Sequence, residues 1–409
     1  SPWSLHKALD APDDLKLSAT FRVRYDMIDG QARPGFNASD DTVNLRTTLF
    51  AEYRTGPVRI GAEVYDSRAY FAVDLDKPFG DGSRATLQAG RFVLNLGSRR
   101  LVAADDYRNT TNGYTGVRAD LASRGGVKAT AIYVLPTTRL PDDLPALLDN
   151  GFAPDRESLD AVLWGGLASK ANVIGKTNAE LSFYHFGERD RVSRPTRDRS
   201  LNTAGFREPA AGKVDFEVEA YYQWGRISSS ALANAATLDV SATFLHADSG
   251  YTFAAPWKPR VSLRFDRVSG DENGPIYSRF DTLYGMRRAE IAPSGLYNSV
   301  GRANMLSPAV RLEVAPSKRT EVFVHYRPLW LASRTDSFST SNVRDVSGRS
   351  GNFAGHQFEM RWRQWLVVDA LRFEANGIYL VKGSFLRNAP NAPAADDTRY
   401  LSLNLTAFF

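Results

Sequence analysis

The sequence predicts an all-β fold, a closed antiparallel transmembrane β-barrel of 18 strands, or of 16 if two weakly patterned regions are merged. Three observations predict it. Polar and apolar side chains alternate in segment after segment along the 409 residues, which gives each strand two faces of different character. Many of these segments reach about ten residues, the length at which a tilted strand crosses hydrocarbon. Short turns alternate with long polar loops, as in a transmembrane barrel.

The strands are predicted one after another along the whole chain. The least distinct are the hairpin at 58–76 and the strand at 198–207. An even number of strands brings both chain ends to the same side of the membrane, as bacterial single-chain barrels require. The predicted strands lie near 15–27, 41–54, 58–66, 69–76, 84–97, 113–122, 126–138, 157–170, 175–187, 198–207, 213–225, 234–253, 258–269, 302–315, 319–333, 352–366, 369–382 and 397–409.

The connections between these strands fall into two classes. Short turns, assigned to the periplasmic side, are predicted at 55–57, 123–126, 254–259, 316–318 and near 367–369. Longer loops, assigned to the extracellular side, are predicted near 28–40, 98–112, 139–156, 188–197, 270–301, 334–351 and 383–396. The stretch 141–150 is the one candidate for a helix, either a plug folded inward or, as we favour, one turn on a loop tip.

No shift in composition divides the chain. We therefore expect residues 1–409 to form a single outer-membrane β-barrel domain. Residues 1–14 are expected to be an N-terminal extension, and 270–301 the longest extracellular loop.

The segment HQFEMRWRQW at 356–365 shows how the two faces of a strand are assigned. A soluble β-sandwich or β-helix, the competing interpretation, would bury the apolar face in a core. In a membrane barrel the apolar face contacts lipid and the polar face lines the lumen. Phe358, Met360 and Trp362 are thus expected to face lipid, and Glu359, Arg361 and Arg363 the lumen. Aromatic residues suited to the lipid–water interface are Tyr25, Tyr53, Tyr222, Trp224, Tyr326 and Trp362.

The last strand, RYLSLNLTAFF, carries an apolar face that ends in the final residue, Phe409. This alternation resembles the terminal strand signal of bacterial outer-membrane proteins, which implies the barrel-assembly machinery as a partner through Phe409. The chain lacks cysteine, which excludes disulfides and thiol chemistry. We expect a Gram-negative outer-membrane location, reached after cleavage of a signal peptide not present in this chain, with lipid and lipopolysaccharide as surroundings.

Parity places an excess of arginine on the lumen face, where guanidinium groups suit carboxylates. Arg91 is included although its glycine-rich surroundings blur the parity. The expected lumen residues are Arg22, Arg24, Arg46, Arg91, Arg264, Arg311, Arg327, Arg361, Arg363 and Arg372, with Glu359 and Glu374 beside them. Further inward acids are Asp26, Glu52, Asp215, Glu217, Glu219, Asp266 and Glu313. A basic wall opposite a partly acidic one would select anions, whereas for single residues ion pairing within the wall is the alternative.

Other classes of function find little support in the sequence. The five histidines form no closely spaced ligand pair, and neither G-x-S-x-G nor H-E-x-x-H occurs, so no catalytic residues, metal or cofactor are expected. The net charge of +5 lacks the Lys/Arg-rich runs of nucleic-acid binding. An outer-membrane surface enzyme is kept as a distant alternative, because catalytic triads assemble in space rather than in sequence.

Four segments together resemble the alginate-export family of outer-membrane barrels. They are VRIGAEVYDSRAY (58–70), QAGRFVLNLGSRRLVAADDYRNTTNGYTGVRADL (88–121), VDFEVEAYYQWGRI (214–227) and SGYTFAAPWKPRVSLRFDRVSGDE (249–272). The resemblance implies a monomeric 18-stranded barrel that passes an anionic polysaccharide through an arginine-rich lumen. Arg46, Arg91 and Arg372 match the family's basic conduit. This chain departs from the family in being shorter, and its connection near 67–68 is almost absent.

These observations favour a passive outer-membrane channel for anionic solutes. The solute is expected to be an alginate-like acidic polysaccharide or a small carboxylate. The alternative is an uptake porin that is either general or takes hydrophobic or aromatic substrates.

Overall fold

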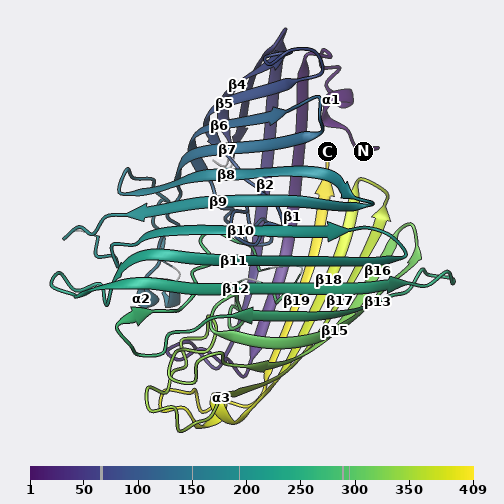
Figure 1. Ribbon diagram of the computed structural model, residues 1–409. Helices are drawn as coiled ribbons and strands as arrows, with labels where there is room; N and C mark the ends of the chain where they lie inside the picture. Colours follow the sequence, from purple (N-terminus) through teal and green to yellow (C-terminus); the bar gives the residue numbers. More distant parts are fainter. Residues whose placement is uncertain (65–67, 150, 193, 288–289, 294) are drawn as a thin grey trace.

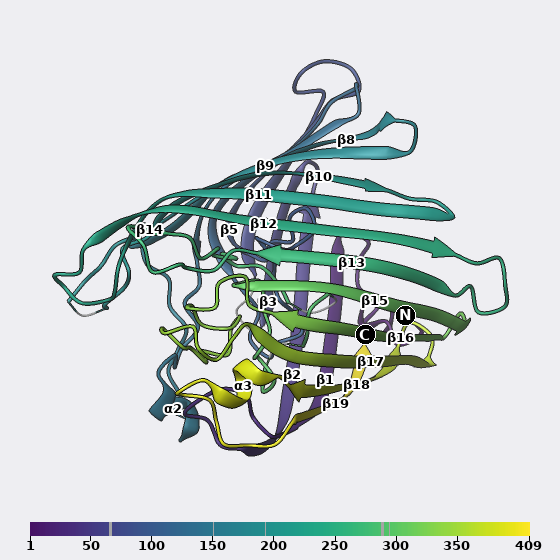
Figure 2. The ribbon, with the colours of Figure 1, turned by 60° about the horizontal axis from the view of Figure 1, so that its bottom comes forward.

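The computed structural model describes residues 1–64, 68–149, 151–192, 194–287, 290–293 and 295–409. Long antiparallel strands follow one another around a single sheet (Figures 1 and 2). β1 (Leu15–Asp29) pairs with β2 (Ser39–Thr55) and also with β19 (Thr398–Phe408), which closes the sheet into a barrel. The prediction of a closed antiparallel barrel of 18 strands is confirmed.

The other barrel strands also run in chain order. They are β3 (Val58–Val64), β4 (Ala69–Asp76), β5 (Arg84–Phe92), β6 (Tyr114–Ala122), β7 (Val127–Pro136), β8 (Ala161–Ile174), β9 (Thr177–Glu188), β10 (Ser200–Ala210), β11 (Val214–Ser228), β12 (Thr237–Thr252), β13 (Arg260–Val268), β15 (Met305–Ser317), β16 (Thr320–Trp330), β17 (Phe353–Val367) and β18 (Leu371–Lys382). The nineteenth strand of the sheet, β14 (Ile276–Tyr277), is a two-residue segment of a loop and pairs in parallel with β12.

The described helices are one turn each: α1 (Leu5–Ala8), α2 (Leu144–Leu148) and α3 (Ser384–Asn388). None of them is long and apolar enough to cross a membrane. α2 lies within the stretch 141–150 that the sequence singled out, whose last residue is outside the described part of the chain.

Both chain ends lie at the end of the barrel that carries the short turns (Figure 1). There the ring of Trp3 stacks on the ring of the terminal Phe409, with 6.0 Å between centroids. We call this the turn end and the opposite one the loop end.

The strand predictions are right for the weakly patterned regions, and several boundaries differ by a few residues, most of all at the end of β5. The hairpin of β3 and β4 and the strand β10 are all present. For the strand predicted at 58–66, residues 65 and 66 lie outside the described ones. The strand predicted at 84–97 ends at Phe92. The alternation in the sequence continues past Phe92 because Leu94 and Leu96 are apolar and buried. These two side chains are buried inside the barrel, where the chain has already left the sheet.

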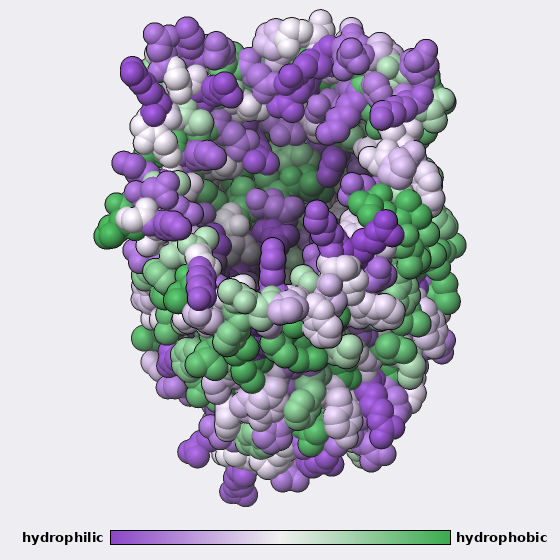
Figure 3. Space-filling view, turned by 90° about the vertical axis from the view of Figure 1, so that its right-hand side faces the viewer, coloured by the Kyte–Doolittle hydropathy of each residue, from purple (hydrophilic) through white to green (hydrophobic). Residues whose placement is uncertain are grey.

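The two faces of the wall are as the alternation predicts. On β17, Phe358, Met360 and Trp362 are 47%, 50% and 42% exposed on the outside, while Glu359 is 6% exposed on the inside. On the outside of β8, β9 and β11, aromatic rings form a continuous belt: Trp164 lies 5.6 Å from Phe183, which lies 6.2 Å from Trp224. From the right-hand side of Figure 1 the molecule is hollowed, and hydrophilic side chains surround the hollow (Figure 3).

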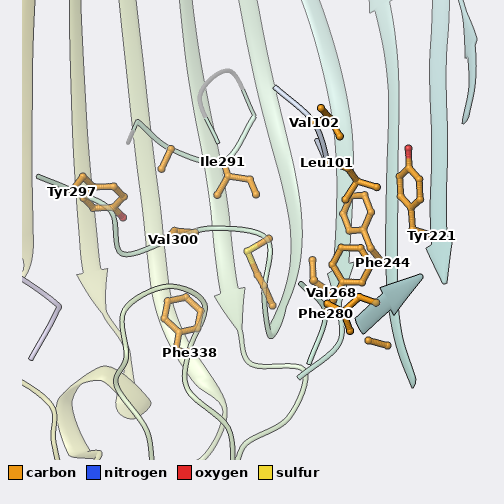
Figure 4. Packing of buried hydrophobic residues seen from close by; sticks show 14 of the residues in the cluster. Leu101, Val102, Tyr221, Phe244, Val268, Phe280, Ile291, Tyr297, Val300 and Phe338 are labelled. Carbon is orange, nitrogen blue, oxygen red and sulfur yellow. The ribbon is translucent and has the colours of Figure 1, made fainter. Parts of the chain in front are cut away.

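Two long loops fold into the barrel and occupy much of its interior. They are the segments 93–113, after β5, and 269–304, after β13, and we call them the inward loops. Leu101, Val102, Ile291, Tyr297 and Val300 from these loops are at most 3% exposed. In Figure 4 they lie with Phe280 and Phe338 inside the wall formed by the strands. An 18-stranded barrel is too wide for wall side chains to fill, so loops supply this core.

The inward loops pair with each other. The amide of Tyr284 donates to the carbonyl of Leu101 at 2.9 Å, and the amide of Ala103 donates to the carbonyl of Tyr284 at 3.1 Å. Each loop is also tied to the wall. In the second loop, the carbonyl of Ile291 accepts from the Gln357 side chain on β17 at 2.8 Å, and the Tyr297 hydroxyl donates to the same side chain at 2.7 Å. In the first loop, the Tyr107 hydroxyl donates to the Ser402 hydroxyl on β19 at 2.8 Å. The backbone groups that left the sheet at Phe92 thus recover hydrogen bonds inside the barrel.

Arg100 holds the inward loops against β11. Its guanidinium is 3% exposed and contacts three carboxylates, those of Glu217 and Glu219 on β11 and that of Glu290 on the other inward loop. The Ser98 hydroxyl adds a 2.7 Å hydrogen bond to Glu219. We call Arg100 and these three carboxylates the Arg100 clamp. Burial alone raises the pKa of Glu290, but the charges of Arg100, Arg302 and His246 outweigh burial and hold that pKa well below its ordinary value.

Replacing Arg100 by Gln is expected to release the inward loops without unfolding the barrel. The change leaves Glu217, Glu219 and Glu290 without their shared cation, and breaking a buried ion pair in this way costs about 3–5 kcal/mol. Arg100 is not part of the paired strands, so the barrel of the variant should stay folded. The purified variant should therefore keep the heat-dependent change in gel migration that marks a folded barrel. Its single-channel conductance in planar bilayers should be larger and noisier than that of the unmodified chain.

Arg207→Gln is the matched control, because Arg207 on β10 pairs with the same Glu217 at 2.8 Å but belongs to the wall. It should leave the conductance unchanged. Equal conductance of the Arg100→Gln variant and the unmodified chain would show that the clamp does not hold the loops.

Candidate functional site

A cavity of about 610 Å³ lies between the inward loops and the turn end of the barrel. We call it the turn-side cavity. Seven arginines and three carboxylates line it. Five of these arginines were expected from parity, namely Arg22, Arg46, Arg361, Arg363 and Arg372, together with Glu374. Arg68, Arg99, Glu63 and Asp106 join them. The cavity therefore carries a surplus of positive charge.

Arg22 and Arg46 lie opposite each other on β1 and β2 and both hold an inward loop. Arg22 donates to the carbonyls of Asp106 at 3.0 Å and Arg108 at 2.9 Å. Arg46 donates to the carbonyl of Asp106 at 3.0 Å as well. Two like charges on adjacent strands repel, and the carbonyl dipoles of the loop offset that repulsion. These two arginines thus line the cavity and anchor its roof.

On β17 and β18 the predicted lumen arginines have different surroundings. Arg363 pairs with Glu374 at 2.7 Å and with Glu321 at 3.2 Å. The Arg372 guanidinium instead lies 5.4 Å from the ring of Trp365 and 5.2 Å from that of Phe408. Within the described residues, no ion pair of Arg372 with a carboxylate is found, so its charge is directed to the cavity.

An aromatic ring that the sequence analysis did not single out orders two further arginines. Phe323 on β16 faces inward and is 2% exposed. The guanidinium of Arg311 lies 3.7 Å from its ring centroid, and that of Arg361 lies 4.7 Å away. Cation–π contact of this kind stabilises both charges, and each guanidinium also pairs with a carboxylate, Arg311 with Glu313 at 2.8 Å and Arg361 with Glu321 at 3.9 Å. The sequence could have indicated this inward ring, because Phe323 occupies a position on the polar face of its strand.

The other predicted lumen residues face inward but lie away from the turn-side cavity. Arg24 and Arg327 are 3% and 1% exposed, because the inward loops cover them, and Glu359 is buried as well. Arg91 pairs with Glu157 of the loop after β7 at 2.9 Å. Arg264 pairs with Asp248 on the neighbouring strand. Whether any of these residues contacts a solute stays a prediction.

The acids of the middle of the chain are engaged by arginines. Asp215 and Asp248 both accept from Arg260, with Asp215 Oδ2 at 2.9 Å from its Nε and Asp248 at 2.6 Å from Nη2. Glu217 and Glu219 belong to the Arg100 clamp. The acidic wall that the sequence suggested is therefore largely neutralised, while the turn-side cavity keeps its positive surplus.

A second cavity, of about 900 Å³, lies on the loop side of the inward loops, and we call it the loop-side cavity. It too is lined by seven arginines and three carboxylates. The arginines are Arg139, Arg156, Arg194, Arg197, Arg199, Arg279 and Arg302. All of them lie in loops of the structure, and the sequence analysis did not single them out. Arg199 and Arg302 fall within the predicted strands 198–207 and 302–315, but β10 begins at Ser200 and β15 at Met305. For the other five, the only signal was the richness of their loops in arginine.

The two cavities meet at the inward loops. Thr111 lines the turn-side cavity and its neighbour Asn112 lines the loop-side one. Likewise Met286 lines the first and Arg302 the second, and the Arg302 guanidinium donates to the Met286 carbonyl. A solute crossing the barrel would pass from one arginine-rich cavity to the other at these loops. Among the residues that the structure describes, no group of three His, Asp or Glu side chains is placed to hold a metal ion.

Comparisons with known proteins agree with this architecture. The chain is similar in fold to OccAB3 of Acinetobacter baumannii, with a TM-score of 0.63, 12% identity, and coverage of 97% of this chain and 100% of that one. It is similar to the outer membrane protein OprD from Pseudomonas aeruginosa (TM-score 0.56, 15% identity, 97% and 94% covered). OccK2 of P. aeruginosa, solved in complex with glucuronate, gives a TM-score of 0.58 at 13% identity, with 97% of each chain covered.

By sequence, none of the curated proteins matches the chain. The alginate-export family, in contrast, matches residues 63–398, which is most of the chain. This match confirms the resemblance seen in the four sequence segments. A closed barrel with an apolar exterior and a polar interior is typical of outer-membrane β-barrels. The chain therefore belongs to the alginate-export family and is an outer-membrane β-barrel channel.

Proposed function

We propose that this chain is a passive, anion-selective channel whose solutes are small carboxylates. The observation that supports this proposal is the excess of positive charge in the turn-side cavity, which is lined by seven arginines and three carboxylates. Guanidinium groups stay charged and bind carboxylates in a two-pronged geometry. A positive surplus along the path raises the local concentration of anions and lowers that of cations.

The size of the interior favours a small solute over a polymer. The inward loops are packed into the barrel, tied to each other and held by the Arg100 clamp. The cavities on their two sides measure about 610 and 900 Å³, which is the range of pockets that take small molecules. The similar fold of OccK2, solved with glucuronate, makes a single sugar acid a suitable probe.

Passage of an acidic polysaccharide is the second candidate, and membership of the alginate-export family favours it. A polymer would need the inward loops to move away from β11, which means breaking the Arg100 clamp. A channel for apolar or aromatic solutes fits less well, because charged side chains surround both cavities.

Removing two arginines of the turn-side cavity is expected to weaken anion selectivity. In the double variant Arg99→Gln/Arg372→Gln, the permeability ratio of chloride to potassium should fall by about twofold or more, since less positive charge faces the path. The ratio follows from reversal potentials across planar bilayers with a salt gradient. Arg22 and Arg46 are unsuitable for this test because they also anchor the loop.

Arg124→Gln removes one positive charge from the turn between β6 and β7, outside the cavity, and should leave the ratio unchanged. A cation-selective unmodified pore, or an equal ratio in all three proteins, would contradict the proposal.

Liposome swelling should separate the two candidate solutes. Glucuronate is expected to enter faster than glucose, which has a similar ring but no charge, and oligomers of uronic acids are expected to enter much more slowly because the inward loops leave no wide passage. Entry of long uronic-acid oligomers at the rate of the monomer would instead favour the polysaccharide candidate.

A further inference from the structure

Lysine is confined almost entirely to one end of this barrel, whereas arginine occurs at both. Ten of the 51 basic residues are lysines, and all ten lie in the part of the chain that the structure describes. Nine of them lie at the turn end. The tenth, Lys382, ends β18 at the loop end, is 3% exposed and donates to the carbonyls of Gln31 at 3.3 Å and Ala395 at 3.1 Å. Exposed lysines are therefore found at the turn end alone.

The nine lysines form a ring around the turn end rather than a single patch. They occur in or beside the turns that follow β4, β6, β8, β10, β12 and β15, which succeed one another around the sheet. The N-terminal segment and β1 add two more where the barrel closes. Figure 3, which looks onto this end, shows hydrophilic side chains along its rim. All nine are exposed, and we call them the turn-end lysines: Lys7, Lys16, Lys77, Lys128, Lys170, Lys176, Lys213, Lys258 and Lys318.

Two of the turn-end lysines lie on the lipid side of the wall. Lys170 shares the outer face of β8 with Trp164, which is 41% exposed, and pairs with the outward Val127 of β7. The Nζ of Lys213 lies 5.1 Å from the ring centroid of Tyr251, which is exposed on the outer face of β12. Lysine stems in such positions lie along the apolar surface and place the ammonium group among the lipid headgroups.

Aromatic rings mark the same level of the wall. Tyr251 packs edge to face on Phe253, with 4.8 Å between ring centroids, and Phe253 is 45% exposed. Trp257, the neighbour of Lys258 in the turn after β12, is 59% exposed. Exposed aromatic rings are enriched where hydrocarbon meets the headgroups. Lysines and rings thus lie together at one membrane interface.

Few carboxylates balance the turn-end lysines. Lys77 pairs with Asp81 at 2.8 Å. Other exposed carboxylates lie at this end, among them Asp14, Glu208 and Asp369. Across the described residues, none of them forms an ion pair with a turn-end lysine. The ammonium groups therefore keep their charge for a partner outside the chain.

We propose that the turn-end lysines bind the phosphate groups of acidic phospholipids in the inner leaflet of the outer membrane. Short turns of such barrels face the periplasm, so the rim of the turn end meets that leaflet. Lys170 and Lys213 point away from the mouth of the pore, which places them against lipid rather than a solute. Lysine is a compact charge on a flexible stem, and each lysine near an acidic membrane surface adds to the attraction.

The test is electron spin resonance of the full chain in phosphatidylcholine bilayers that contain a trace of spin-labelled phosphatidylglycerol or spin-labelled phosphatidylcholine. The spectrum reports the share of labelled lipid that is immobilised against the barrel. The unmodified chain should favour phosphatidylglycerol by about twofold or more at low salt, and roughly 1 M salt should remove most of this preference. In the triple variant Lys170→Gln/Lys213→Gln/Lys258→Gln the preference should fall by about half or more.

Two control variants separate the lysines from net charge and from misfolding. Arg189→Gln/Arg334→Gln/Arg349→Gln removes the same charge from exposed loop residues at the other end and should keep the preference. Lys170→Arg/Lys213→Arg/Lys258→Arg keeps the charge in place and should keep it too. The heat-dependent change in gel migration shows that each variant is folded.

Every other outcome overturns the inference. Equal immobilisation of the two lipids by the unmodified chain excludes a site for acidic lipid, and an unaltered preference in the lysine-to-glutamine variant places it elsewhere. Equal losses in that variant and in the arginine-to-glutamine variant reduce the effect to net charge. Loss of the preference on adding inorganic phosphate at constant ionic strength assigns the lysines to free phosphate. A lower permeability ratio of chloride to potassium with unaltered lipid preference assigns them to the solute.

Discussion

The Arg100 clamp is the contact on which the interior of this barrel depends. An 18-stranded wall encloses more space than its own side chains can fill, so the inward loops must supply the core. Loops in a wide lumen stay in place only if something holds them. A buried guanidinium cannot discharge itself by losing a proton, and the three carboxylates, one buried and two partly buried, repel one another without it. Arg100 and Glu217, Glu219 and Glu290 therefore require each other, and the loops are fixed as a consequence.

The wall of the barrel could be predicted from the sequence because a strand residue has only two environments. A shift of one position would move every side chain to the other face, so the alternation around Phe358, Met360 and Trp362 settles which face is which. Lipid on the outside inverts the rule for soluble sheets, and the arginines on the opposite face then mark the lumen. The same logic found even the short hairpin of β3 and β4, which pairs with its neighbours over few residues.

The interior could not be predicted in the same way. Parity shows that Arg24, Arg327 and Arg372 point inward, but not that loops cover the first two and leave the third beside a cavity. Whether an inward residue is covered depends on contacts between segments far apart in the chain, which have no period. The early end of β5 has the same origin, because its last alternating residues are buried by the loops rather than by the sheet.

In the proposed anion-selective function, selectivity and closure would depend on two of the same side chains. Arg22 and Arg46 line the turn-side cavity and also hold the inward loop through its carbonyls. A solute carboxylate that binds these guanidinium groups competes with the loop for their N–H donors, because each guanidinium has a fixed number of donors. Binding of an anion at this point therefore weakens the attachment of the loop that narrows the path. The Arg372 guanidinium lies beside aromatic rings and, within the described residues, makes no hydrogen bond or ion pair with the loop, so in the proposed function it would attract anions without affecting the attachment of the loop.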